Sequence, residues 1–335
     1  MADKDKKYNV LNASRLSVAP MMDWTDRHCR FLHRQITSHA LLYTEMITAP
    51  ALVRGGAVHL LDHSPAEHPV AVQLGGSDPD ELAQATRIAA DSGYDEVNLN
   101  VGCPSDRVQS GAFGAVLMKD PALVARIARA MVAASRVPVT VKCRIGVDDQ
   151  VPQQVLPDFI ERMADAGVTR LTVHARMAWL EGLSPKENRD IPPLDHELVH
   201  EMKARFPALH LSVNGGIETL AQAQGHLARG LDGVMIGRAA YHRPWDLLAD
   251  VDRAIFDARP PHAHPEQVVA AMQPYIEQHL SAGGKLAQVT RHMLGLFTGR
   301  PGARRFRQIL SSEAHKPGAD GRVVQAALAA VLAAA

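Results

Sequence analysis

Aromatic residues make up only 4% of the 335-residue sequence, and neither sign of charge is in excess, since 36 basic side chains balance 36 acidic ones. The scarcity of rings argues against a surface that binds nucleic acid mainly by base stacking. The zero net charge excludes a protein that is basic over its whole surface. Contact with a polyanion therefore depends on local clusters of Lys and Arg.

Cysteine is also scarce, and membrane signals are missing. Cys29, Cys103 and Cys143 form no Cys-x-x-Cys pair, and the 17 histidines show no His-Glu-x-x-His spacing, so we expect neither a disulfide framework nor a metal site. The longest apolar run, residues 326–335, is about half as long as a membrane-spanning helix. Residues 1–9 match neither a secretory signal nor a mitochondrial presequence. These features predict a cytoplasmic protein that does not enter a membrane.

Short aliphatic runs alternate with amphipathic stretches between residue 16 and about residue 250. Such alternation is typical of βα units around a parallel sheet, and eight runs are the number that closes a (β/α)8 TIM barrel. Asp-Pro pairs also predict helices over residues 80–91 and 121–135. We therefore predict an α/β barrel with strands at Leu16–Ala19, Ala40–Tyr43, Val70–Leu74, Asp95–Asn98, Val139–Lys142, Arg170–His174, Leu211–Asn214 and Gly233–Ile236.

A proline-rich stretch, residues 258–265, interrupts this pattern after the eighth run. We take it as the boundary between a barrel domain over residues 1–258 and an all-helical domain over residues 266–335. In the second domain, seven Lys or Arg residues and one acidic residue lie between Lys285 and Lys316. This local excess predicts a patch that contacts phosphates; the alternative is a solvated basic helix face.

Polar or glycine residues follow every predicted strand. The carboxyl ends of barrel strands share one mouth, so we expect one ligand to occupy it. A doubly wound sheet would instead concentrate such residues at one switch point. The residues concerned are Pro20, Met21, Met22, Glu45, Gln73, Asn98, Asn100, Lys142, Arg144, His174, Arg176, Asn214, Gly215, Gly216, Gly237 and Arg238.

The stretch Asn98-Leu-Asn-Val-Gly-Cys-Pro104 ends the fourth run with two amides and a thiol. Gly102 allows a sharp turn and Pro104 restricts the backbone, so Cys103 is expected on a defined loop. A free thiol is mostly protonated at neutral pH, because its pKa is near about 8.5, and this suits it to deliver a proton. The alternative is a buried structural cysteine.

Gly215-Gly216 after the seventh run and Gly237-Arg238 after the eighth predict a phosphate-binding site, because backbone amides at glycine approach a ligand closely. The alternative is that these glycines only turn the chain. Lys142 points into the barrel if its neighbour Cys143 packs outward as a structural cysteine. A buried lysine needs negative charge, from an anionic ligand or from a core carboxylate such as Glu45. No Gly-x-Gly-x-x-Gly follows any strand, so a permanently bound dinucleotide is not expected.

Several motifs occur in a fixed order along these strands. The chain is similar to the tRNA dihydrouridine synthases, flavoenzymes that reduce uridines in tRNA, and most similar to the dihydrouridine synthase A branch, which acts on D-loop positions 20 and 20a. The motifs that carry the resemblance are Asn98-Leu-Asn-Val-Gly-Cys-Pro-Ser105, His174-Ala-Arg176, Gly182-Leu-Ser-Pro-Lys-Glu-Asn-Arg189, His292-Met-Leu-Gly-Leu-Phe297 and Pro301-Gly-Ala-Arg304.

The resemblance implies a bound FMN and a transient NADPH that reduces it. Hydride from the flavin would reach C6 of the uracil, and Cys103 would protonate C5. The flavin contacts implied are Pro20, Met21, Met22, Gln73, Lys142, His174, Asn214, Gly215, Gly216, Gly237 and Arg238. The tRNA contacts implied are Asn98, Asn100, Arg144, Arg176, Lys186, Arg189, Arg304, Arg305 and Arg307.

Two other functions are compatible with parts of this pattern. Another FMN barrel, similar to a dihydroorotate dehydrogenase, would reduce or oxidise a free pyrimidine but would need no basic helical domain. An RNA-binding protein on an inactive barrel would not need Cys103, Lys142 and the phosphate grip together. We therefore expect a monomeric enzyme whose partner is its tRNA substrate.

Overall fold

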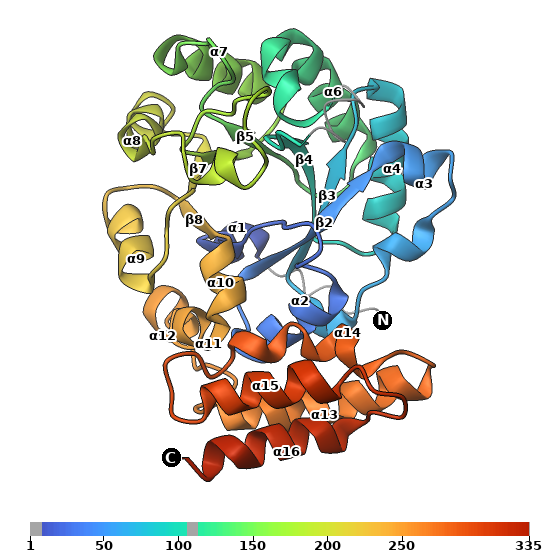
Figure 1. The fold of residues 1–335 in the computed structure, drawn as a ribbon. Helices are drawn as coiled ribbons and strands as arrows, with labels where there is room; N and C mark the ends of the chain where they lie inside the picture. The colour runs from blue at the N-terminus through green and yellow to red at the C-terminus, as the bar shows by residue number, and fades with distance from the viewer. Residues whose placement is uncertain (1–8, 106–112, 335) are drawn as a thin grey trace.

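The computed structural model describes residues 9–105 and 113–334. Eight parallel strands pair in chain order and close into a barrel, which confirms the predicted TIM-barrel fold (Figure 1). The strands are β1 (Leu16–Val18), β2 (Leu41–Thr48), β3 (Val70–Gly75), β4 (Glu96–Val101), β5 (Val139–Arg144), β6 (Arg170–His174), β7 (His210–Asn214) and β8 (Gly233–Ile236).

Helices surround the barrel and form the C-terminal part of the chain (Figure 1). The α-helices are α1 (Val10–Ala13), α2 (Arg27–Arg34), α3 (Ala49–Val53), α4 (Pro79–Asp91), α6 (Pro121–Ala134), α7 (Pro152–Asp165), α8 (His196–Arg205), α9 (Leu220–Ala228), α10 (Arg238–His242), α11 (Pro244–Leu248), α12 (Val251–Phe256), α13 (Pro265–Ser281), α14 (Leu286–Thr290), α15 (Ala303–Glu313) and α16 (Gly321–Leu332). Short 3-10 helices are η1 (Val58–Leu61), η2 (Pro65–Glu67), η3 (Gly114–Lys119), η4 (Glu187–Arg189) and η5 (Met293–Gly295).

The two helices predicted from Asp-Pro pairs are confirmed. The side chain of Asp78 accepts a hydrogen bond from the N–H of Glu81 and begins α4, and Asp120 does the same for Leu123 at the start of α6. A carboxylate at this position satisfies a backbone donor that has no partner inside the helix. Within the described part of the chain, no helix is both long and apolar enough to cross a membrane.

Four predicted strands end too early, β3 by one residue and β2, β4 and β5 by more. β2 continues to Thr48, which pairs with Gly75, and β4 continues to Val101, which pairs with Cys143 in the lengthened β5. Glu45, Asn100 and Arg144 therefore lie within strands instead of after them, because backbone pairing persists up to the mouth.

Side chains alternate between the two faces of the barrel wall along most strands, whereas β2 is irregular between Tyr43 and Met46. Along β4, Val97, Leu99 and Val101 belong to the apolar cluster that packs against the helices. The residues between them, Glu96, Asn98 and Asn100, point into the barrel, because neighbours on a strand face opposite sides. The wall is thus apolar toward the helices and unusually polar inside, where a TIM barrel normally holds branched aliphatic side chains.

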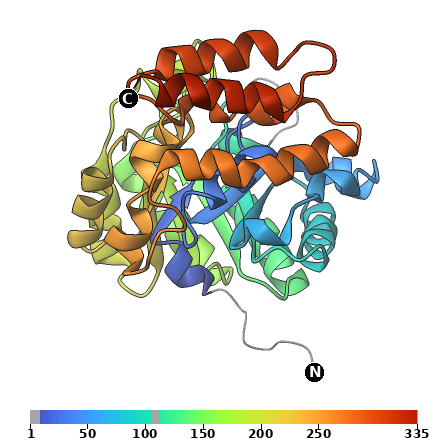
Figure 2. The ribbon, with the colours of Figure 1, turned by 90° about the horizontal axis from the view of Figure 1, so that it is seen from below.

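Residues 257–264 connect α12 to α13 irregularly, at the position of the predicted domain boundary. The helices that follow pack on one side of the barrel, beside α2 and α10 (Figure 1). Their buried residues, such as Met272 and Phe306, belong to the same apolar cluster as the outward-facing barrel residues. Figure 2 shows α15 and α16, in red, at the end of the barrel opposite to α1, in dark blue. Because α1 contacts the beginning of β6 through Arg170, that opposite end is the mouth.

Candidate active site at the barrel mouth

The turn that carries Cys103 begins where β4 ends. Oδ1 of Asn100 accepts hydrogen bonds from the backbone N–H groups of Gly102 and Cys103, both at 3.0 Å. Cys103 is half-buried, and its Sγ lies 3.5 Å from the hydroxyl of Ser105. Cys29 and Cys143 are buried. Cys103 is therefore the accessible thiol of the three, and it is held on a defined turn.

Three amides lie side by side beneath this turn. Nε2 of Gln73 donates to Oδ1 of Asn98 at 2.8 Å. Nδ2 of Asn100 donates to Oε1 of Gln73 at 2.7 Å. Asn98 has no exposed surface, and its Nδ2 donates to the hydroxyl of Thr140 at 2.8 Å. Both ends of the Asn98 amide are thus used inside the barrel, where it supports Gln73 and does not face the mouth. Asn100, which is 8% exposed, lies nearest to the thiol.

Lys142 and His174 project into the barrel, since Cys143 and Val173 beside them pack outward. Burial and the neighbouring Arg144 guanidinium lower the pKa of Lys142 to about 8. Burial, Arg144 and Lys142 hold the pKa of His174 well below its usual value. The imidazole is therefore neutral at physiological pH, so no imidazolium is available there to supply a proton.

The alternative ion pair between Lys142 and Glu45 is not found. The groups that shift the pKa of Lys142 are guanidinium and thiol groups and include no carboxylate. Glu45 lies beside Asp23 and Asp26, and its pKa is raised by burial and then by Asp26. Positive charge at Lys142 therefore has no carboxylate partner among these neighbours, which favours an anionic ligand.

Arg144 ties the Cys103 turn to the long loop after β6. Its Nε donates to the carbonyl of Gly102 at 3.1 Å, and its Nη1 donates to the carbonyls of Met177 and Asn188 at 3.0 and 2.9 Å. Arg144 is only 2% exposed. Burial lowers its pKa to about 10, so the guanidinium remains charged at neutral pH. Arg144, which the resemblance implies as a tRNA contact, is thus buried and links the Cys103 turn to the loop after β6 by hydrogen bonds.

The same loop carries exposed cations. Lys186 and Arg189 are exposed, and the half-buried Arg176 donates to the carbonyl of Pro192. Arg238 forms an ion pair of 2.7 Å with Asp190. Arg238, an implied flavin contact, is thus already paired with a carboxylate, and a phosphate bound there would have to replace Asp190.

The glycine pair after β7 has a geometry that only glycine adopts readily. Gly215 and Gly216 have φ angles of +106° and +67°. A Cβ on Gly215 would lie 2.6 Å from the His174 ring, and one on Gly216 would lie 2.3 Å from Leu194. The preceding Asn214 donates from Nδ2 to the carbonyl of Met235 at 2.8 Å and so fixes β7 against β8. This bare backbone beside a cationic mouth fits an anionic group such as a phosphate.

Pro20, Met21 and Met22 follow β1. Met22 is 52% exposed, whereas Met21 is half-buried and packs on the apolar cluster. The sulfur of Met21 lies 3.6 Å from the place of a Cβ on Gly237, so the ends of β1 and β8 meet at the mouth. Thr25 holds this segment, since its hydroxyl accepts from the N–H of Met21 at 3.0 Å.

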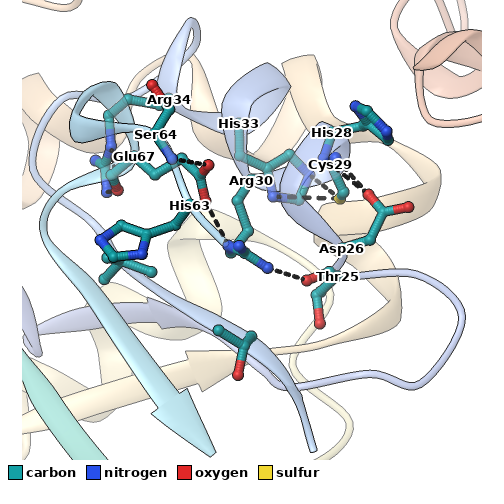
Figure 3. Close-up of polar contacts among 12 residues, drawn as sticks. Thr25, Asp26, His28, Cys29, Arg30, His33, Arg34, His63, Ser64 and Glu67 are labelled. Carbon is teal, nitrogen blue, oxygen red and sulfur yellow. Dashed lines mark hydrogen bonds and ion pairs between the residues drawn. The ribbon is translucent and has the colours of Figure 1, made fainter. Parts of the chain in front are cut away.

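A buried network on α2 supports that segment (Figure 3). Arg30 forms a 2.7 Å ion pair with Glu67 and donates to the carbonyl of Thr25 at 2.8 Å. Asp26 begins the helix and pairs with Arg291 at 2.5 Å and with His292 at 3.0 Å. Burial opposes the ionised form of Asp26, but the hydrogen bond from His292 and its charge outweigh burial and lower the pKa well below the usual value. The β1 loop is thus joined to the helical part of the chain.

Arg304, Arg305 and Arg307 are exposed on α15, while Phe306 and Leu310 pack inward. The basic stretch predicted from the sequence therefore forms a surface patch on a helix that Figure 2 places toward the mouth. Arg305 donates from Nη1 to Oε1 of Gln308 on the same helix at 2.9 Å.

The sequence reasoning missed four residues inside the barrel. Glu96 and Arg170 form an ion pair, and Tyr43 and Thr140 donate to Oε1 of Glu96 at 2.7 and 2.5 Å. All four are nearly or fully buried. The signal was present as the alternation Glu-Val-Asn-Leu-Asn, which places Glu96 on the same face as the two asparagines.

The chain is similar to proteins of known family. The sequence matches the dihydrouridine synthase (Dus) family over residues 17–332. It is 54% identical to the tRNA-dihydrouridine(20/20a) synthase of Yersinia pestis, covering 95% of this chain and 91% of that one, and 54% identical to that of Escherichia coli K12, covering 96% and 93%. The fold resembles an old yellow enzyme homologue from Zymomonas mobilis with a TM-score of 0.50 and 16% identity, over 72% of this chain and 88% of that one. This chain belongs to the dihydrouridine synthase family.

Proposed function

We propose that the protein is a flavin-dependent tRNA dihydrouridine synthase that uses FMN and NADPH to reduce the C5–C6 double bond of D-loop uridines 20 and 20a. The relatives that match over nearly the full chain are named tRNA-dihydrouridine(20/20a) synthases. The observation that carries the proposal is the Cys103 turn, where Asn100 holds an accessible thiol at the mouth of a cationic barrel.

The residues at the mouth fit FMN. The bare backbone of Gly215 and Gly216 would hold its phosphate with Gly237 and Arg238, and Lys142 would face the isoalloxazine ring with Gln73 and His174. Pro20, Met21, Met22 and Asn214 would border the same ligand. When bound, FMN supplies the hydride for C6 of the uracil, having received it from NADPH.

Protonation of C5 falls to Cys103. His174 is neutral and the Cys143 thiol is buried in the wall, where burial raises its pKa to about 12. Cys103 alone among the three cysteines combines accessibility with a fixed backbone at the mouth. Asn100, which orients this turn, lies where its amide can meet the base edge.

The substrate contacts divide into two groups. Arg176, Lys186 and Arg189 lie on the loop after β6, next to the thiol turn through Arg144. Arg304, Arg305 and Arg307 lie on α15, in the helical part of the chain that we propose binds the body of the tRNA. Extrusion of a uridine from folded RNA costs a few kcal/mol, which contacts at both places would offset. We further propose that the protein acts as a monomer in the cytoplasm.

The proposal is tested by product mapping. Purified protein, NADPH and an unmodified tRNA transcript should yield dihydrouridine at positions 20 and 20a, detected by mass spectrometry of nuclease fragments. Transcripts that carry cytidine at one of the two positions assign each product separately. Dihydrouridine elsewhere would overturn the site assignment, and turnover of a free pyrimidine instead of tRNA would support an enzyme similar to dihydroorotate dehydrogenase.

A further inference from the structure

A continuous series of hydrogen-bonded side chains crosses the barrel interior from the start of β4 to the Cys103 turn. We call this series the relay; its members are Glu96, Thr140, Asn98, Gln73 and Asn100. It begins at the buried ion pair of Glu96 with Arg170, whose exposed side-chain fractions are 0% and 4%. Nη1 of Arg170 also donates to the carbonyl of Val10 at 3.3 Å, beneath the barrel. The relay thus starts at the end of the barrel remote from the mouth, where no ligand is expected.

Each link of this relay is a single hydrogen bond. The hydroxyl of Thr140 donates to Oε1 of Glu96 at 2.5 Å and accepts from Nδ2 of Asn98 at 2.8 Å. Oδ1 of Asn98 accepts from Nε2 of Gln73 at 2.8 Å, and Oε1 of Gln73 accepts from Nδ2 of Asn100 at 2.7 Å. Oδ1 of Asn100 is thereby left to accept the two backbone N–H groups of the turn, at 3.0 Å each.

The ionised carboxylate dictates the direction of every link. A carboxylate has only acceptors, so the hydroxyl of Thr140 must give its single proton to Glu96 and can only accept from Asn98. Each amide that follows then has one allowed orientation. We propose that Glu96 is a positioning residue that, through this relay, presents the oxygen of Asn100 to the backbone of Cys103. This inference rests on the proposed role of Cys103, but its first test does not.

Replacement of Glu96 by glutamine separates this role from packing. Arg170 has only donors, so it would select the amide oxygen and turn the new NH2 group toward Thr140. Thr140 would then donate to Asn98, and the reversal would pass along the relay. The NH2 group of Asn100 would end against the N–H groups of the turn, and both hydrogen bonds would be lost.

The reactivity of the Cys103 thiol reports the order of its turn. We would measure its alkylation by iodoacetamide in wild type, Glu96→Gln and Tyr43→Phe, with Cys103→Ser as the background from Cys29 and Cys143. Tyr43→Phe is the matched control, because it removes a 2.7 Å hydrogen bond to the same Glu96 oxygen without cutting the relay. We expect alkylation about fivefold faster or more in Glu96→Gln, the scale of one lost hydrogen bond, and within about twofold of wild type in Tyr43→Phe.

A second pair leaves the ion pair intact. Thr140→Val cuts the relay, whereas Thr140→Ser keeps the hydroxyl, so only the valine variant should raise the alkylation rate and lower kcat for uridine reduction at unchanged FMN content. This pair decides the matter if Glu96→Gln does not fold. Wild-type alkylation in Thr140→Val, or equal acceleration in Tyr43→Phe and Glu96→Gln, would overturn the inference. If the variants change the alkylation rate as expected but the wild-type protein does not reduce uridine in tRNA, the inference stands and the proposed function is contradicted.

Discussion

The side-chain oxygen of Asn100 accepts a hydrogen bond from the backbone N–H of Cys103 at 3.0 Å. An amide at the last inward position of β4 thereby determines where the thiol lies. The turn is also held from the other side, because Arg144 donates to the carbonyl of Gly102 at 3.1 Å. Two strands thus fix the proposed proton donor, and variants of the thiol can be interpreted without large changes of the loop.

Cys103→Ala should fold and bind FMN but form dihydrouridine about 10²–10⁴-fold more slowly, the usual contribution of a general acid. Product is measured in tRNA, and FMN content by absorbance. Cys143→Ala is the matched control, since this thiol packs in the wall and should cost stability without loss of the reaction. Normal turnover by Cys103→Ala would remove this residue as the proton donor.

FMN affinity should depend on the charge of Lys142. The ammonium attracts an anionic ligand, and with a pKa of about 8 in the free protein it is present below that pH and lost above it. Between pH 7 and 9, affinity measured by flavin fluorescence should fall, by at most about tenfold per pH unit above 8. Lys142→Gln should bind more weakly at pH 7 and show a flatter profile. Parallel profiles for the two proteins would contradict this role.

Gly216→Ala should weaken FMN binding, because a Cβ would lie 2.3 Å from Leu194 in a backbone with φ of +67°. The matched control is Gly230→Ala, where φ is +95° but no atom lies within 4 Å of the Cβ. Both should lose about 1 kcal/mol of unfolding free energy to backbone strain, measured by urea denaturation. Only Gly216→Ala should lose FMN affinity; equal affinities in the two variants would argue against a phosphate at this glycine pair.

The patch on α15 should bind phosphates. Alanine at Arg304, Arg305 and Arg307 should weaken tRNA binding and reduce the slope of log Kd against log salt concentration by about 2–3, with NADPH-dependent flavin reduction unchanged. The control replaces Arg87, Arg126 and Arg129, exposed cations on α4 and α6 away from the helical part of the chain (Figure 1). If both triple variants bind tRNA alike, the patch on α15 is only solvated surface.

Much of the barrel followed from the sequence because its strands are short apolar runs, and Lys142 could be directed inward from alternation alone. The strand ends could not be placed, since pairing of Thr48 with Gly75 depends on a neighbouring strand and not on local residues. The ion pair of Arg238 with Asp190 was equally hidden, because it joins the start of α10 to a loop residue 48 positions earlier in the chain. Glu96 was missed because an acidic residue inside a strand reads locally as solvent-exposed.

The most direct test is anaerobic. The protein is reduced with NADPH, excess nucleotide is removed, unmodified tRNA is added, and flavin absorbance is followed. We predict rapid reoxidation by tRNA, no reoxidation by uracil or orotate, and slow reoxidation by tRNA in Cys103→Ala. Reoxidation by orotate alone, or absence of bound flavin, would contradict the proposal that this barrel reduces uridines in tRNA.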